Sequence, residues 1–147
     1  MKHIKLFEQF VNEKIEYSST KVNGQDVTSS WAGKADNEKD FIKMIENAPE
    51  TLKSIQVQTG TSYFNPDREE FKGPITASTK KKIIKIIKDV TKEYKAKGDP
   101  IVSYQFNSYY GVFGKDHESH PAYIQYSTKG SDRFASDMSS GKYGRLD

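Results

Sequence analysis

The sequence contains no cysteine, which excludes a disulfide framework and a zinc site built on thiolates. No apolar run approaches the about 20 residues of a membrane-spanning helix. The first residues alternate apolar with charged side chains and lack the apolar core of a secretory signal. We therefore expect a protein that is neither secreted nor embedded in a membrane.

Apolar residues are also scarce, at 34% of the chain with a mean hydropathy of −0.82. Globular proteins are nearer to about 45–50% apolar. The 8 Phe, 9 Tyr and 1 Trp nevertheless offer large surfaces to bury. At 147 residues we expect one domain with a small, aromatic-rich core. The net charge of +3 does not by itself require a nucleic-acid partner.

Residue spacing predicts the first elements of the fold. Apolar residues three and four apart predict an amphipathic helix over 4–16. Asn23-Gly24 favours a type I′ turn, because both residues tolerate a positive φ. This turn predicts a hairpin of strands at about 16–22 and 25–31.

A second helix is predicted after Asp36 or Asn37, either of which can cap it, and Pro49 ends it. Its expected apolar face consists of Phe41, Met44 or Ile45, and Ala48. Alternating apolar residues then predict a strand over 55–59. The turn-forming residues of 60–74 predict a long loop.

The clearest predicted element is a lysine-rich helix that begins after Thr76 or Ser78 and ends at Gly98. Its expected buried face consists of Ile83, Ile87, Val90 and Tyr94. Residues 101–113 and 122–128 predict a second hairpin. In the first of these strands, Val102, Tyr104, Phe106 and Ser108 are expected to share one face.

The predicted order of elements is therefore α-ββ-α-β-α-ββ. It favours a two-layer α+β fold with a mostly antiparallel sheet of about five strands and two to three helices. We predict an amphipathic leader or docking helix at 1–13 and a single domain at 14–128. The Gly/Ser-rich residues 129–147 lack periodicity and predict a flexible or partner-docked tail.

One short stretch carries residue types that bind metals. Its four candidate ligands are Asp116, His117, Glu118 and His120. The alternative is a polar hairpin loop, because Gly114 precedes the stretch and Pro121 follows it. No motif places a nucleophile beside these residues, and no glycine-rich phosphate loop is found. The sequence thus gives no support for an enzyme, and we expect no cofactor.

The lysine-rich helix is the second candidate site. Its candidate contacts to nucleic-acid phosphates are Lys80, Lys81, Lys82, Lys85, Lys88 and Lys92. Nearby tyrosines that could stack on bases are Tyr104, Tyr109, Tyr110 and Tyr123. The alternative is an ordinary solvated helix face, since no RNA-binding signature is present.

The opening stretch MKHIKLFEQFVNE is the third candidate. An amphipathic helix there would present Ile4, Phe7, Phe10 and Val11 to a partner. The stretch resembles the N-terminal capsid-targeting segment of internal head proteins in T4-like tailed phages. The match consists of the Met-Lys start, the core Phe7-Glu8-Gln9-Phe10 and the terminal Glu13, with Val11 where Leu or Ile is usual.

This resemblance implies delivery into an assembling phage head, with Glu13 as a processing site for the maturation protease. Capsid, scaffold or other virion proteins would be the partners, in the virion or the host cytoplasm. We therefore expect a phage virion or head-associated protein. Two alternatives remain open, namely a nucleic-acid-binding or host-directed regulatory module and a small metal-dependent enzyme that uses residues 116–120.

Overall fold

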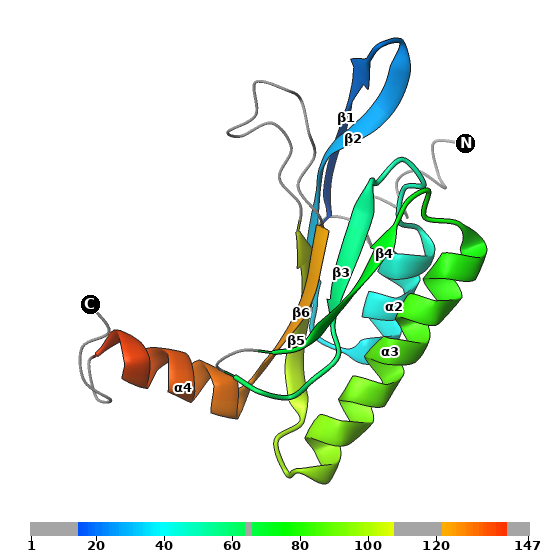
Figure 1. Ribbon diagram of the computed structural model, residues 1–147. Coiled ribbons are helices and arrows are strands. Elements are labelled where there is room, and N and C mark those ends of the chain that lie inside the picture. Colours follow the sequence, from blue (N-terminus) through cyan, green and yellow to red (C-terminus); the bar gives the residue numbers. More distant parts are fainter. Residues whose placement is uncertain (1–14, 64–65, 108–121, 141–147) are drawn as a thin grey trace, which may run out of the picture.

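The computed structural model describes residues 15–63, 66–107 and 122–140. Six strands form one sheet in the order β1-β2-β5-β6-β3-β4 (Figure 1). They are β1 (Glu16–Val22), β2 (Gln25–Ala35), β3 (Ser54–Gln58), β4 (Arg68–Lys72), β5 (Ile101–Asn107) and β6 (Ala122–Thr128). The helices are α2 (Glu38–Glu46), α3 (Ala77–Ala96) and α4 (Lys129–Ser139).

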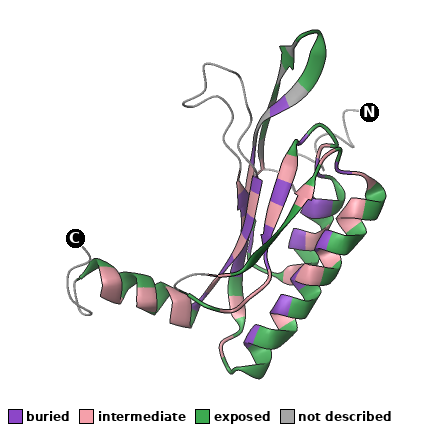
Figure 2. Ribbon diagram, viewed as in Figure 1, coloured by how far each residue is buried: buried purple, intermediate pink, exposed green. Residues whose placement is uncertain are grey.

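Only the β3–β6 pair of this sheet is parallel, and the other neighbours are antiparallel. Helices α2 and α3 pack side by side on one face of the sheet (Figure 1). The buried residues of Figure 2 lie mainly where these two layers meet. The predicted α+β class with a mostly antiparallel sheet is thus confirmed.

The β1–β2 hairpin forms as its turn residues predict. Asn23 and Gly24 have φ angles of +53° and +81°, the left-handed conformation that a type I′ turn requires. Among the described residues, the long second strand, β2, pairs with β5 through its last residues, Gly33–Ala35. The hairpin therefore extends beyond the rest of the sheet, as Figure 1 shows.

Both covering helices begin where capping chemistry predicts. The Asn37 side chain accepts a hydrogen bond from the Asp40 N–H at 2.8 Å, and Thr76 accepts one from the Thr79 N–H at 3.3 Å. The predicted apolar stripes of both helices are buried. The core that they cover is aromatic, with the Trp31 ring stacked on Phe106 at a centroid distance of 3.7 Å.

The long loop predicted over 60–74 is wrong in part, because it contains β4. This strand is an edge strand with the sequence REEFK, and Phe71 is its only residue that packs against the core. Charged side chains are a common means of protecting a sheet edge from further pairing. They also remove the alternating apolar pattern on which strand prediction depends.

A helix, α4, occupies much of the segment in which we predicted no regular element. None of its residues is fully buried, and in Figure 1 it extends away from the sheet on the side opposite α2 and α3. Its start is fixed by a capping box between Thr128 and Ser131. The capping box and the half-buried face that carries Phe134 and Met138 thus account for a helix in this segment.

The face predicted for residues 102–108 is also partly wrong. Tyr104 and Phe106 are buried, but Val102 is 39% exposed. The register of β5 against β6 shifts between Ile101 and Ser103. An extra residue at such an irregularity turns the preceding side chains to the other face.

Candidate functional site

Two of the three candidate sites fall outside the described residues. They are the leader residues Ile4, Phe7, Phe10, Val11 and Glu13, and the loop residues Asp116, His117, Glu118 and His120. In the described part of the chain, no group of three or more metal-ligating side chains is present. The lysine-rich helix α3 is the candidate site that the structure places.

Five lysines of α3 lie on one face of the helix, and we call them the lysine stripe. They are Lys81, Lys85, Lys88, Lys92 and Lys95, each three or four residues from the next. At 3.6 residues per turn these positions fall within about 80° of one another, and the stripe is about 21 Å long. Lys95 was not among the predicted contacts, although its spacing completes the pattern.

The stripe points to solvent because the opposite face of α3 is buried. Ile83, Ile87 and Tyr94 pack into the core, and all five lysines of the stripe are exposed. A helix with an apolar stripe on one side presents its charged residues on the other. The geometry that anchors α3 therefore also aligns the cations.

Few carboxylates neutralise this surface. Lys85 forms an ion pair with Asp89 at 3.0 Å, and both side chains are more than half exposed. Such surface pairs contribute at most about 1 kcal/mol and are weakened by salt. Among the described residues, no carboxylate lies within ion-pair distance of the other four lysines of the stripe.

Two of the predicted contacts do not belong to the stripe. The Lys80 ammonium donates to the carbonyl oxygen of Glu46 at 3.1 Å and so helps to join α3 to α2. Lys82 lies about 100° around the helix from Lys81, on the same side as Asp89. The basic surface is therefore narrower and more regular than the set of six lysines predicted from the sequence.

The structure does not bring the described tyrosines to this surface. Tyr104 is buried, and its hydroxyl lies 3.0 Å from the Thr91 hydroxyl. Tyr123 lies on β6 between the buried Ala122 and Ile124, so it faces the side of the sheet away from α3, with Arg68 over its ring. Tyr109 and Tyr110 lie outside the described residues. In the part of the chain that the structure describes, the stripe thus offers charge without aromatic side chains on which bases could stack.

A second polar cluster, which the sequence did not predict, surrounds Asp99. This residue follows α3, and its carboxylate accepts hydrogen bonds from Thr128 Oγ1 at 2.6 Å, from the Gly130 N–H at 3.1 Å and from the Tyr63 hydroxyl. The cluster joins the α3–β5 turn, the β3–β4 loop and the start of α4. A carboxylate beside a helix N-terminus also interacts favourably with the helix dipole.

The same contacts set the charge state of Asp99. Desolvation opposes ionisation, but the hydrogen bonds from Thr128, Tyr63 and Gly130 together outweigh it and lower the pKa of Asp99. The bond to Asp99 in turn raises the pKa of Tyr63. Tyr63 also contacts the Phe134 ring of α4 at a centroid distance of 5.9 Å. Asp99 is therefore an anchor for α4.

Replacing Asp99 by alanine is expected to loosen α4 without unfolding the sheet. The Gly130 N–H and the Thr128 hydroxyl would lose their acceptor, a loss of about 1–3 kcal/mol for partly buried groups. Amide hydrogen exchange at Gly130 and Ser131 should accelerate while exchange in β5 stays slow. Unchanged exchange at Gly130 would contradict the anchoring role.

The stability of the contacts that Asp99 makes with α4 should also depend on pH. Because the folded pKa of Asp99 is lowered, its stabilisation is present above the unfolded value of about 3.9 and is lost as pH falls through the folded pKa. The protection factor of the Gly130 N–H, which is the exchange rate corrected for the intrinsic effect of pH, should therefore fall in acid in the natural chain. An Asp99→Asn variant, which cannot titrate, should lack this step.

No protein-family model, curated protein or solved structure matches the chain. Within the described residues, no helix is both long and apolar enough to span a bilayer. The function has therefore to be argued from the chain's own residues.

Proposed function

We propose that this chain is a non-enzymatic, head-associated virion protein of a tailed phage, assembled through residues 1–13. The observation that carries the proposal is the match of Phe7, Phe10 and Glu13 to the leader of internal head proteins. In the described part of the chain, the buried apolar core runs from Trp31 to Tyr126, and Ile15 packs against it.

Docking of such a leader follows from its amphipathic pattern. A helix of 13 residues is marginal in water, so binding to a partner would supply the packing that it lacks. Ile4, Phe7, Phe10 and Val11 would enter an apolar groove of a capsid or scaffold protein. Cleavage after Glu13 would then leave a body that begins at Lys14.

Deleting residues 2–13 should abolish incorporation of the protein into phage particles, because the apolar docking face is lost. Mass spectrometry of purified particles measures the incorporated protein and also shows whether Lys14 is its first residue. A Phe7→Ser/Phe10→Ser variant should fail likewise, whereas His3→Ser, outside the matched positions, should be incorporated normally. Normal incorporation of the deleted chain would refute the proposal.

The lysine stripe favours a second function, the binding of a nucleic acid through its phosphates. Four of its five lysines lack a carboxylate partner among the described residues, and they follow one line along α3. Contacts of this kind are independent of base sequence and fall steeply with salt. A gel-shift series from low to physiological ionic strength tests the function, and no binding at low salt would remove it.

A further inference from the structure

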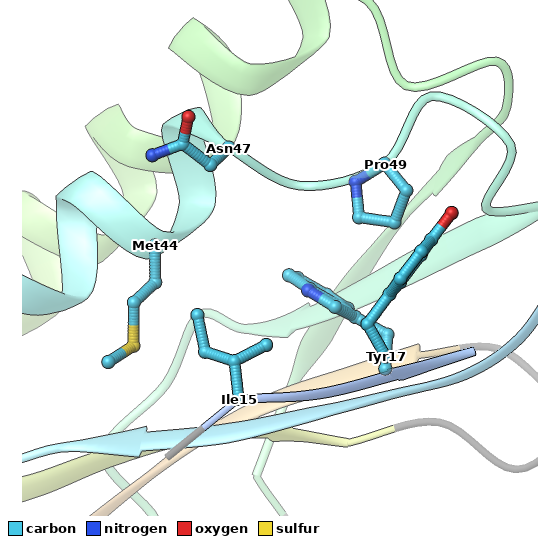
Figure 3. A pocket seen from close by; sticks show the side chains of 6 residues that line it. Ile15, Tyr17, Met44, Asn47 and Pro49 are labelled. Carbon is cyan, nitrogen blue, oxygen red and sulfur yellow. The ribbon is translucent and has the colours of Figure 1, made fainter. Parts of the chain in front are cut away.

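An apolar cavity of about 420 Å³ opens between α2 and the β1–β2 hairpin. Figure 3 shows Met44 of α2 and Asn47, the residue after that helix, on one side and Ile15 and Tyr17 on the other, with Pro49 above Tyr17. Trp31 also lines the cavity. Its size lies within the about 300–1,000 Å³ of sites that hold compact apolar ligands.

The lining favours an apolar occupant with one exposed edge. Ile15, Trp31 and Met44 form the inner wall, and Tyr17, which is 53% exposed, stands at the rim. A large apolar side chain that is half exposed beside a cavity leaves surface that an occupant can cover. Among the described lining residues, Asn47 carries a side-chain amide, which donates to the Lys43 carbonyl oxygen at 2.9 Å.

We propose that this cavity is the docking site for the chain's own residues 7–11, with Phe10 and Val11 as the inserted side chains. The segment joins the cavity directly, because Ile15 both follows it and lines the cavity. At up to about 3.6 Å per residue, Val11 reaches about 14 Å from Ile15 and Phe10 about 18 Å. Both side chains can therefore enter the cavity without any change in the described fold.

Covalent linkage makes this occupant the favoured one. A segment attached a few residues from its site acts at an effective concentration of the order of millimolar. A free partner at micromolar concentration would need a correspondingly greater intrinsic affinity to compete. Intramolecular docking would also shield the apolar face of residues 4–11 from water before a partner is met.

Charge adds to the fit. Glu46 and Glu50 are exposed, and each is adjacent in sequence to a lining residue, at the end of α2 that carries the negative pole of the helix dipole. Residues 1–11 carry Lys2 and Lys5 against one carboxylate, Glu8, so their net charge is opposite to that of the rim.

The docking of residues 7–11 in the cavity does not depend on the proposed function. Only the consequence of docking for binding to a partner rests on that function. A capsid or scaffold partner that binds the same apolar face would first have to displace it from the cavity. The leader would then stay docked in the cavity until that partner is present.

The test uses the full chain with ¹³C-labelled methionine methyl groups. The chain has 3 methionines, of which Met44 lines the cavity and Met138 lies on α4, away from it. In a Phe7→Ser/Phe10→Ser variant the Met44 methyl resonance should move by more than its linewidth, while that of Met138 stays in place. A His3→Ser variant is the matched control and should move neither. Unchanged Met44 in the double variant overturns the proposal.

A second variant perturbs the cavity and leaves the segment intact. Asn47→Phe places an aromatic ring at the mouth of the cavity, so it should release the segment and make cleavage after Glu8 by a glutamate-specific protease several-fold faster. Cleavage at the rate of the natural chain overturns the proposal. A Met44 shift that grows with protein concentration also overturns it, because the occupant would then be a second copy. None of these outcomes depends on incorporation into particles, so the docking and the leader function can fail separately.

Discussion

Replacing Lys81, Lys88, Lys92 and Lys95 together by glutamine is expected to remove binding to nucleic acid at physiological ionic strength. Each lysine–phosphate contact contributes about −0.9 to the slope of log K against log salt for duplex DNA. Four lost contacts should therefore flatten the slope by about 3–4. The free energy of unfolding should change little, because all four side chains are exposed and lack ion pairs among the described residues. Gel-shift titrations at several salt concentrations measure the slope.

A matched control removes the same charge from elsewhere on the surface. Its four substitutions to glutamine are at Lys34, Lys53, Lys72 and Lys129, all exposed and all outside α3. If the stripe is the contact surface, this variant should keep most of the salt slope. Equal losses in the two variants would mean that net charge, and not the alignment of lysines on α3, drives the binding.

Local chemistry made much of the fold predictable. The left-handed Asn23-Gly24 turn, the caps Asn37 and Thr76 and the apolar stripe of α3 all depend on residues near one another in sequence. Strand β4 lacks the alternating apolar pattern because it is charged, and helix α4 has a local capping box but no fully buried face. Their positions depend on neighbours distant in the sequence.

The candidate site, like the fold, could be predicted from the sequence only in part. Helical spacing alone aligns the lysine stripe, but the diversion of Lys80 to the Glu46 carbonyl depends on how α3 packs against α2. The Asp99 anchor was missed because its donors come from residues 29–36 positions away along the chain. The apolar pattern of residues 4–11 predicts a face to be covered, whereas the cavity beside Trp31 arises only once α2 folds over the hairpin.

Replacing Phe106 by alanine is expected to destabilise the protein by about 3–5 kcal/mol, a large share of the about 5–15 kcal/mol of a typical domain. Phe106 is 1% exposed in the central strand β5, stacked on Trp31 and 5.7 Å from the Phe41 ring. Truncation removes these contacts and leaves a cavity among rigid aromatic rings. The midpoint of urea denaturation should fall with little change in slope. Val102→Ala, at an exposed position of the same strand, should cost less than about 0.5 kcal/mol.

Gly33 pairs with Phe106 across the β2–β5 ladder, so a substitution at Gly33 tests the position of the Phe106 ring. A Cβ at Gly33 would lie 2.6 Å from Phe106 Cζ, so Gly33→Ala should destabilise the natural chain by forcing the ring aside. In the Phe106→Ala background the nearest side-chain atom that remains among the described residues is Ile15 Cγ1, at 3.2 Å, so Gly33→Ala should cost much less than in the natural chain. The double-mutant cycle should thus give a favourable coupling of about 1–3 kcal/mol. Equal costs of Gly33→Ala in both backgrounds would mean that the ring does not rest against the backbone of β2.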